Sequence, residues 1–262
     1  MARLAGAAVA VAAAVACTAI LLALGGGYEP AMQEPIPDAP VRPTFDRSAL
    51  LADLDQANLT LGQPVFIRIF KQERVLEVWM DDADDGFRPF KSYEICRFSG
   101  EPGPKLAEGD MQAPEGFYRV GARQLNPASR HHLAFNLGFP NVYDRQLGRT
   151  GSALMVHGGC SSTGCYAITD EGVDEVYALV DAALAAGQAA VDVHIFPFRL
   201  TAAALAAVEG HRWAPFWANL KEGFDRFEQE GIPPRVGACD GRYVFGDNRL
   251  PADCEAVLPW PT

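Results

Sequence analysis

The sequence has 262 residues and a formal net charge of −11, with 33 acidic and 22 basic side chains. Apolar residues make up 49% and charged residues 21%, which is typical of a globular protein with a sizeable core and excludes a disordered or fibrous chain. Because the chain is acidic and contains no basic run, we exclude nucleic acids and anionic lipid surfaces as partners.

The first residues are typical of an export signal. Arg3 gives a positive start, and an uncharged apolar stretch runs from Leu4 to Leu24. This stretch exceeds the roughly 7–15 residues of an ordinary signal core and approaches the roughly 20 residues that cross a bilayer. Residues 1–27 are therefore predicted to be a cleaved signal peptide or a retained membrane anchor, and the protein to lie in the periplasm or cell envelope.

A proline-rich segment separates this signal from the rest of the chain. Five prolines within residues 28–44 favour an extended spacer. Residues 45–262 are predicted to form the folded domain. Ser48 is predicted to cap a short helix that carries Leu50 and Leu54 on one side.

The next part of the chain is mainly β. Runs of β-branched and aromatic residues predict a hairpin of strands 65–70 and 75–80, joined by four polar residues. A Gly- and Pro-rich loop follows over 100–114. Further strands are predicted at 90–98, 116–120, 154–156 and 191–196.

The C-terminal part adds helices. Apolar residues from Val173 to Leu184 have helical spacing, with Thr169 or Asp170 as the N-cap and Gly187 as the stop. Two more helices are predicted, one from Thr201 and an amphipathic one over 213–229. The predicted fold class is α+β: a mainly β domain with added helices and a C-terminal helical extension.

Cysteine usage fits an oxidising compartment. Apart from Cys17 in the apolar stretch, the cysteines are Cys96, Cys160, Cys165, Cys239 and Cys254. Cys239 and Cys254 flank a Gly-, Asp- and Asn-rich stretch, and we predict a disulfide across it; the alternative is two unpaired thiols. The pairing of Cys96 and Cys160 stays open. Because disulfides take cysteines in pairs, one of these five thiols remains unpaired. In an exported protein an unpaired thiol indicates a function.

The densest chemical signal lies in residues 156–166. A predicted strand ends at His157, and a loop of small residues returns to Gly164 and Cys165. An imidazole beside a cysteine takes the thiol proton and favours the reactive thiolate. Glycine lets backbone N–H groups turn toward a developing oxyanion. His157 and Cys165 are thus candidates for a general base and a nucleophile.

Two other interpretations of this segment remain. His157 can be an ordinary strand-end residue, with Cys160 and Cys165 as buried thiols or as disulfide partners of each other. A metal site would combine these three residues with His194, but the Cys-x4-Cys spacing is wider than that of common zinc sites, and no second close pair of cysteines supports it. We predict no metal, and no other cofactor, since phosphate-loop and dinucleotide motifs are absent.

The segment resembles the signature of YkuD-type L,D-transpeptidases, and more closely their YafK-like branch. The similarity includes Met155-Val156-His157-Gly158, the run from Ser162 to Ala167, and Thr169-Asp170. Other similar motifs are Gly103-Pro104-Lys105, Gly109-Asp110, Gln112 to Tyr118, Phe135 to Gly138, Pro140-Asn141, His194 to Phe198, Phe216-Trp217 and Asn219 to Lys221. The histidine that precedes Gly-Cys in the wider family is Thr163 here, and the arginine that follows the cysteine is missing.

This resemblance implies a YkuD-like β-sandwich catalytic domain over 45–262. It also implies a cysteine L,D-transpeptidase that acts on diaminopimelate-containing stem peptides of peptidoglycan. Cys165 would form a thioester with the peptide and His157 would move the proton, with the N–H groups of Gly164 and Cys165 as the expected oxyanion hole. His132, Arg145 and Arg149 are further candidates for substrate binding, whereas His194 is expected to be a core histidine whose ring is hydrogen-bonded.

Two alternative functions stay open. Water can resolve the same thioester, which would make the protein an L,D-carboxypeptidase or an amidase that releases a peptidoglycan-attached protein. A catalytically silent peptidoglycan-binding module is the third option, although such a module has no need of a free thiol.

Overall fold

The computed structural model describes residues 45–82, 86–246 and 249–259. The chain divides into two units after Pro43, and the described residues all belong to the second. The predicted signal or anchor, 1–27, and the predicted spacer, 28–44, lie outside the described residues. Within the described ranges, no helix has the length and apolar character needed to cross a bilayer.

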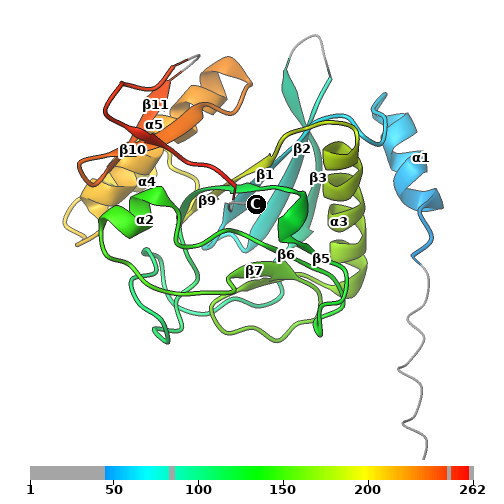
Figure 1. The fold of residues 1–262 in the computed structure, drawn as a ribbon, viewed down its shortest axis with the longest axis horizontal. Helices are drawn as coiled ribbons and strands as arrows, with labels where there is room; N and C mark the ends of the chain where they lie inside the picture. Colours follow the sequence, from blue (N-terminus) through cyan, green and yellow to red (C-terminus); the bar gives the residue numbers. More distant parts are fainter. Residues whose placement is uncertain (1–44, 83–85, 247–248, 260–262) are drawn as a thin grey trace, which may run out of the picture. The chain divides into compact units, whose positions relative to one another are not determined.

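A five-stranded mixed sheet, sheet A, lies at the centre of this unit (Figure 1). Its strands, in the spatial order β3-β2-β1-β9-β4, are β3 (Phe87–Glu94), β2 (Val75–Asp81), β1 (Val65–Phe70), β9 (Val191–Phe196) and β4 (Gly116–Val120). β1 and β9 pair in parallel, and the other neighbours pair antiparallel. All six side chains of β1 are buried, as expected for a strand covered on both faces.

The predicted strands of sheet A are largely confirmed. The hairpin formed by β1 and β2 has the predicted position, and the strands 116–120 and 191–196 correspond to β4 and β9. The third strand was predicted over 90–98, but β3 ends at Glu94. The chain leaves the sheet there because Arg97 instead forms an antiparallel bridge with Ala167, in the neighbouring sheet.

That neighbouring four-stranded sheet, sheet B, carries the candidate site. Its strands, in the order β5-β6-β7-β8, are β5 (Leu125–Asn126), β6 (Ala134–Asn136), β7 (Met155–His157) and β8 (Tyr166–Ala167). The sequence predicted only the strand at 154–156, which corresponds to β7 with a shift of one residue. The other three strands have two or three residues, too few to display a period, and no apolar run marks them. A 3₁₀ turn over Ala122–Gln124 precedes this sheet.

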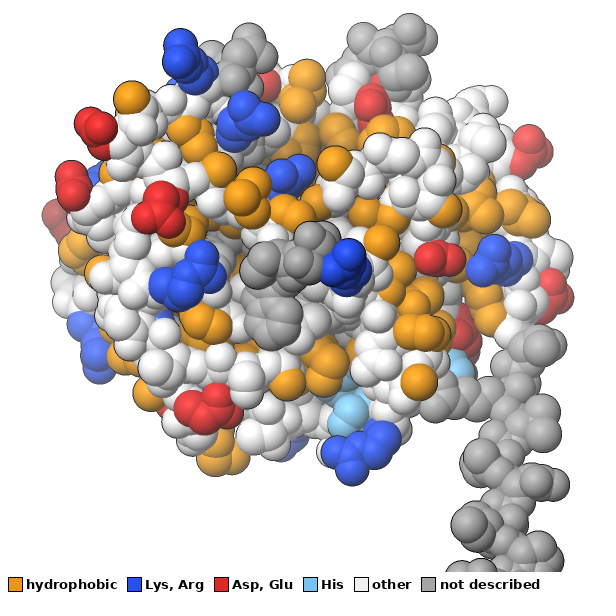
Figure 2. All heavy atoms as spheres, in the orientation of Figure 1, with side chains coloured by type: hydrophobic (Ala, Val, Ile, Leu, Met, Phe, Trp, Pro, Cys, Tyr) orange, Lys and Arg blue, Asp and Glu red, His pale blue; other side chains and the backbone are white. Residues whose placement is uncertain are grey.

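Charged side chains of both signs are spread over the surface. On the face drawn in Figure 2, Lys and Arg side chains lie scattered among acidic and uncharged ones, and the described residues form no continuous basic patch on that face.

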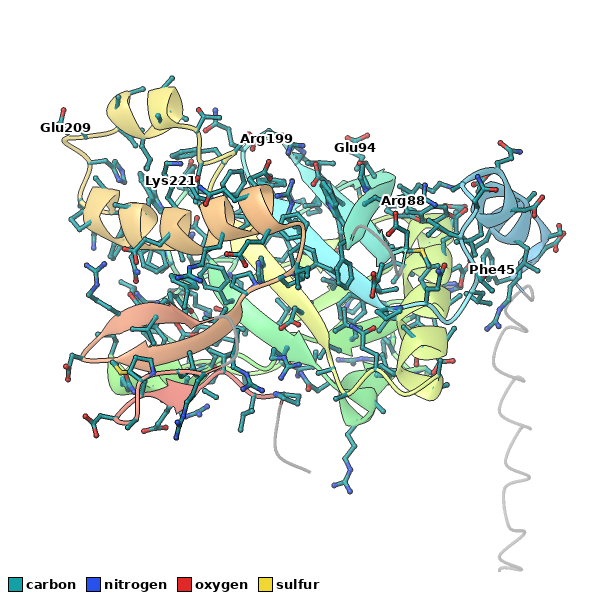
Figure 3. The ribbon with its side chains drawn as sticks, turned by 90° about the horizontal axis from the view of Figure 1, so that it is seen from above. Phe45, Arg88, Glu94, Arg199, Glu209 and Lys221 are labelled. Atoms are coloured by element: carbon teal, nitrogen blue, oxygen red, sulfur yellow. A yellow bond between two sulfur atoms is a disulfide. The ribbon has the colours of Figure 1, made fainter. Side chains whose placement is uncertain are left out.

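The C-terminal part is not only helical. It contains α4 (Ala202–Ala206), α5 (Ala214–Glu230) and a third sheet, sheet C, of β10 (Arg235–Cys239), β11 (Arg242–Gly246) and β12 (Glu255–Ala256). α5 packs beside sheet C (Figure 3), and α2 (Val142–Gln146) contacts β10. The helix predicted over 213–229 is confirmed as α5, whereas sheet C was missed.

The turn between β10 and β11 carried a signal for this missed hairpin. Asp240 and Gly241 link the paired residues Cys239 and Arg242, and both have positive φ, 47° and 71°. Asp-Gly at such a two-residue turn is a strong local hairpin signal. The structure also joins Cys239 to Cys254 in a disulfide, which ties β10 to the segment before β12.

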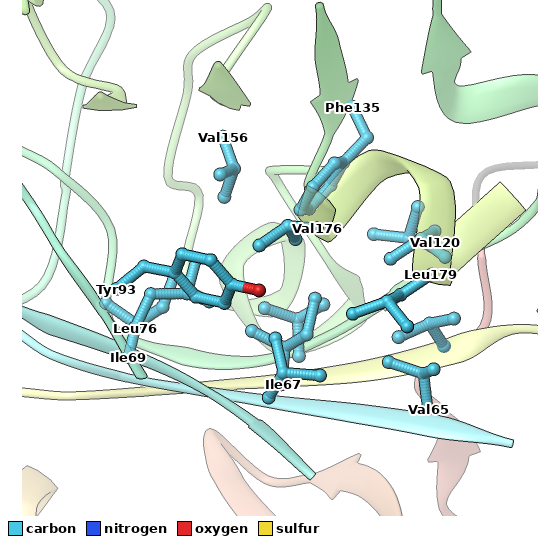
Figure 4. Packing of buried hydrophobic residues seen from close by; sticks show 14 of the residues in the cluster. Val65, Ile67, Ile69, Leu76, Tyr93, Val120, Phe135, Val156, Val176 and Leu179 are labelled. Atoms are coloured by element: carbon cyan, nitrogen blue, oxygen red, sulfur yellow. The ribbon is translucent and has the colours of Figure 1, made fainter. Parts of the chain in front are cut away.

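A hydrophobic core lies between sheet A, sheet B and α3 (Asp170–Ala185) (Figure 4). Val176 and Leu179 of α3 meet Ile67 of β1, while Phe135 and Val156 reach the same core from sheet B. Each such side chain contributes about 1.5–3 kcal/mol by its burial. The core therefore fixes sheet B, and with it the candidate site, against the central sheet. The helices predicted at 48–57 and 173–184 are confirmed as α1 (Ser48–Gln56) and α3. The predicted cap of α1 is wrong, because Arg47 occupies the N-cap position and Ser48 is the first residue of the helix.

The cap of α3 permits a stability test. The Thr169 hydroxyl accepts a hydrogen bond from Gly172 N at 3.1 Å, so Thr169→Ala is expected to lower the free energy of unfolding by about 1 kcal/mol. Thr201→Ala, at the start of the five-residue helix α4, is the matched control. Because α4 buries none of its residues, this substitution should lower the free energy of unfolding by a smaller amount. Urea unfolding measures both, and equal stability of Thr169→Ala and wild type would contradict the assignment.

Candidate active site

The pairing of β7 with β8 brings His157 and Cys165 to one face of sheet B. The two strands run parallel, with Val156 opposite Tyr166 and His157 opposite Ala167. Val156 and Tyr166 are fully buried in the core beneath α3. Because successive side chains of a strand alternate, His157 and Cys165 point away from that core together.

Cys165 is the one unpaired cysteine among the described residues, and it is 9% exposed. Its Sγ lies 3.5 Å from the carbonyl oxygen of Ala153, to which the thiol donates, and 3.4 Å from Met155 N, which donates to it. Burial raises the pKa of the thiol, whereas the Met155 N–H and the positive charge of Lys105 lower it. Burial prevails, so the resting group is a protonated thiol.

His157 is held in one tautomer. It is 2% exposed, and its Nδ1 lies 2.7 Å from the carbonyl oxygen of Gly158. Because a carbonyl only accepts, Nδ1 carries the proton of the neutral ring, and the lone pair is on Nε2. Burial lowers the pKa of this imidazole. At neutral pH His157 is therefore uncharged and able to accept a proton.

A second histidine lies against His157. The ring centroids of His131 and His157 are 4.6 Å apart, with a 33° angle between the planes, and the proximity of His131 adds to the lowering of the His157 pKa. Among the described residues, no hydrogen bond joins His157 to Cys165. Catalytic hydrogen bonds are often long before the substrate binds, so this arrangement is compatible with proton transfer between the two.

The loop between His157 and Cys165 is restrained at three points. Cys160 forms a disulfide with Cys96, which resolves the pairing that the sequence left open. The Ser162 hydroxyl donates to the carbonyl of Cys165 at 2.9 Å. Gly164 N, an expected oxyanion-hole donor, donates to Ser99 Oγ at 2.6 Å.

The other predicted binding residues have local partners. His132 Nε2 lies 2.7 Å from a carboxylate oxygen of Asp174 on α3. Arg145 donates to the carbonyl of Pro140 at 2.7 Å. Arg149 is buried and forms an ion pair with Asp144 at 2.8 Å. The described contacts place none of His132, Arg145 and Arg149 beside Cys165.

Sequence reasoning missed His131 and Lys105, which do approach the candidate pair. His131 is adjacent to the histidine that was chosen, and no period in that segment distinguishes the two. Lys105 belongs to the Gly-Pro-Lys motif, so its type and position were visible in the sequence.

The residues of the alternative metal set lie apart. Cys160 is bonded to Cys96. His194 lies on β9 between the rings of Phe66 and Phe117, with centroid distances of 4.6 and 4.7 Å. It is 1% exposed, which confirms the expected core position. Neither ring nitrogen has a hydrogen-bond partner among the described residues, so the expectation of a hydrogen-bonded core histidine is wrong; the aromatic rings around it offer no acceptor or donor in the plane of the imidazole. Within the described ranges, no group of three or more His, Cys, Asp or Glu residues is arranged to hold a metal ion.

The raised pKa of Cys165 predicts how the thiol reacts. The rate of its alkylation by iodoacetamide is expected to rise with pH through a midpoint above the ordinary thiol value, because only the thiolate reacts. Lys105→Gln should move the midpoint higher still, since it removes a charge that favours the thiolate. Peptide mass spectrometry at Cys165 measures the rate, and a midpoint below neutral pH would contradict the prediction.

Comparison with known proteins identifies the family. No family model matches the chain. The Escherichia coli (strain K12) protein named "Putative L,D-transpeptidase YafK" is 45% identical over 199 residues, which is 76% of this chain and 79% of that protein. The chain belongs to the YafK family. The YafK protein of Escherichia coli O157:H7 matches to the same extent.

Similarity to solved structures is weaker. The helical cell shape determining protein Pgp2 of Campylobacter jejuni, as its K307A mutant, matches with a TM-score of 0.41 and 23% identity over 57% of this chain and 54% of that one. Bd1075 of Bdellovibrio bacteriovorus matches with a TM-score of 0.36 and 20% identity over 53% and 52% of the two chains. The chain spans about half the length of these two structures.

Proposed function

We propose that the protein is a cysteine L,D-transpeptidase of the cell envelope that acts on diaminopimelate-containing stem peptides of peptidoglycan. The observation that carries the proposal is the free thiol of Cys165 on the same face of the sheet as His157, whose tautomer leaves Nε2 as an acceptor. The name of the YafK relative supports the same reaction class. The proposal includes a YkuD-like β-sandwich as the fold of the catalytic domain.

The chemistry proceeds in two halves. His157 Nε2 takes the proton of Cys165 as the sulfur attacks the carbonyl carbon at the L-centre of the diaminopimelyl residue. The bond to the next residue breaks, His157 returns the proton to the leaving amine, and a thioester remains on Cys165. An incoming amine then attacks the thioester, loses its proton to His157 and releases the new peptide with the thiol restored.

Backbone N–H groups stabilise the tetrahedral intermediate in this scheme. Gly164 and Cys165 are the proposed donors, and each such donor contributes a factor of about 10²–10³ to the rate of the chemical step. Because Gly164 N donates to Ser99 Oγ in the substrate-free site, its N–H must shift from the hydroxyl to the oxyanion. Because the loop before Cys165 is short and restrained, the Gly164 N–H has only a short distance to move.

Mass spectrometry of diaminopimelate-containing tetrapeptide muropeptides tests the reaction class. The sample is the protein without reductant, and the control is the same protein after alkylation at Cys165. Cross-linked dimers formed only by the unmodified protein would establish the transpeptidase. Trimmed, uncrosslinked peptides would establish the hydrolase instead, and unchanged muropeptides in both samples would overturn the proposal for this substrate.

A further inference from the structure

A fully buried lysine lies outside the candidate pair. Lys71 directly follows β1 and is 0% exposed. Its ammonium has four oxygen acceptors: the carbonyls of Glu101 at 2.9 Å and of Gly103 and Ala113 at 3.0 Å, and Glu115 Oε1 at 3.0 Å. A buried ammonium is tolerated only where a carboxylate and other acceptors replace its water. The four acceptors around Lys71 meet that condition.

The four acceptors come from both ends of one segment, residues 99–115, which we call the wall loop. Glu101 and Gly103 lie near its start, and Ala113 and Glu115 at its end, so the ammonium bridges the two ends of the loop. The Gln112 side chain adds a second bridge, because it donates to the carbonyls of Glu101 and Gly103. Glu115 is also 0% exposed and accepts from Gly103 N at 2.6 Å and from Trp217 Nε1 of α5 at 3.0 Å. The closure is therefore braced by the C-terminal helix.

The base of the wall loop leads directly to the candidate nucleophile. Ala113, whose carbonyl accepts from Lys71, donates its own N–H to the carbonyl of Ser99 at 3.0 Å. The hydroxyl of Ser99 in turn accepts from Gly164 N at 2.6 Å. Gly164 immediately precedes Cys165. A chain of three hydrogen bonds thus runs from the Lys71 ammonium to the backbone beside the thiol.

The tip of the wall loop reaches the other side of Cys165. Its Leu106 carbonyl accepts from Thr150 N at 3.1 Å, and its Glu108 N donates to the Thr150 hydroxyl at 3.1 Å. Lys105 packs so closely on Gly151 that a Cβ there would meet Lys105 Cε at 2.6 Å. This segment continues to Ala153, whose carbonyl accepts from the Cys165 thiol.

We propose that Lys71 is a positioning residue that, by closing the wall loop, sets where Ser99 and Lys105 stand against Cys165. No described contact joins Lys71 itself to Cys165 or His157, so it acts through the loop. The proposal rests on the proposed function only in taking Cys165 as the nucleophile. Its consequence is that α5, through Trp217 and Glu115, takes part in shaping the site.

The test uses the charge-balanced variant Lys71→Met/Glu115→Gln in the full chain, because removing both charges avoids a lone buried ion. The readouts are the pH midpoint of Cys165 alkylation and the turnover of muropeptides. Loss of the three carbonyl contacts should release the loop and carry Lys105 away from the thiol. We expect the midpoint to rise, because the Lys105 charge no longer favours the thiolate, and kcat to fall by about tenfold to a hundredfold.

Two comparisons separate positioning from general loosening. Adding Lys105→Gln to the double variant should shift the midpoint no further, whereas Lys105→Gln alone shifts it. The matched control is Arg68→Met/Glu77→Gln, which removes another buried ion pair, at 3.1 Å, together with the pairs of Arg68 with Glu228 and of Glu77 with Arg199. Neither residue has a described contact to the wall loop. This control should leave the midpoint at the wild-type value.

An unchanged midpoint and unchanged kcat in a folded Lys71→Met/Glu115→Gln variant would overturn the proposal, as would an equal shift in the control. If the double variant does not fold, Trp217→Phe removes one hydrogen bond to Glu115, and the absence of any midpoint shift there counts against the proposal in the same way. If wild type alters no muropeptide while the midpoint still shifts as expected, the proposed function fails and the positioning role stands.

Discussion

Cys165→Ala is expected to reduce turnover of stem peptides by at least about a thousandfold, because removal of a nucleophile leaves only binding and oxyanion stabilisation. The fold should persist, since the described contacts of the thiol are two long hydrogen bonds, to Ala153 and Met155. Initial rates on purified muropeptides measure the effect, with far-ultraviolet circular dichroism and urea unfolding as checks on the fold.

Cys165→Ser is the informative companion to the alanine variant. Serine keeps the size and a hydroxyl proton but ionises far less readily than a thiol, so it should also lose nearly all activity. A folded Cys165→Ala protein with wild-type rates would remove Cys165 from the mechanism. The alternative function, a catalytically silent peptidoglycan-binding module, would then be favoured.

His157→Gln is expected to lower kcat by about 10²–10⁴-fold, the usual contribution of a general base. Glutamine can still donate to the Gly158 carbonyl but cannot accept a proton on a second nitrogen. The pH profile adds a second check. Burial lowers the pKa of His157, so wild-type activity should persist below the ordinary histidine pKa. It should be lost as the pH falls through the lowered value, where the ring becomes protonated.

His131→Gln is the matched control for this prediction. The His131 ring contacts His157, and its proximity lowers the His157 pKa. Its removal should therefore move the acid limb of the profile to higher pH while changing the plateau by less than about tenfold. If His131→Gln abolished activity and His157→Gln did not, the roles of the two histidines would be reversed.

The sequence was most informative where function and local pattern coincide. The short apolar run that ends at His157 and the glycine before Cys165 indicated a pair on neighbouring segments, and the parallel register of β7 and β8 supplies the common face. The same reasoning failed for two-residue strands such as β8, because so short a segment has no measurable period. Asp240-Gly241 did carry a hairpin signal, yet the polar composition around it favoured a loop.

The wall loop shows a different limit of sequence reasoning. Lys71 stands in a run of four polar residues between two strands, which is typical of an exposed turn. It is nevertheless buried, because it pairs with Glu115, which lies 44 residues further along the chain. No local period or propensity reports such a distant pairing. The sequence offers no reason to distinguish His131 from His132, since the contact that distinguishes them is with His157 on β7.

The parallel pairing of β1 with β9 has a consequence for the order of folding. Phe66 of β1 lies opposite Asp192 of β9, so β1 can pair with this neighbour only after much more of the chain has been synthesised. Until residues 191–196 emerge, the chain presents a long apolar strand with one open edge, the kind of surface that pairs with other chains. Pairings between such distant segments also slow folding. A fragment that ends before β9 is therefore expected to aggregate, and release of almost the whole chain must precede formation of the site.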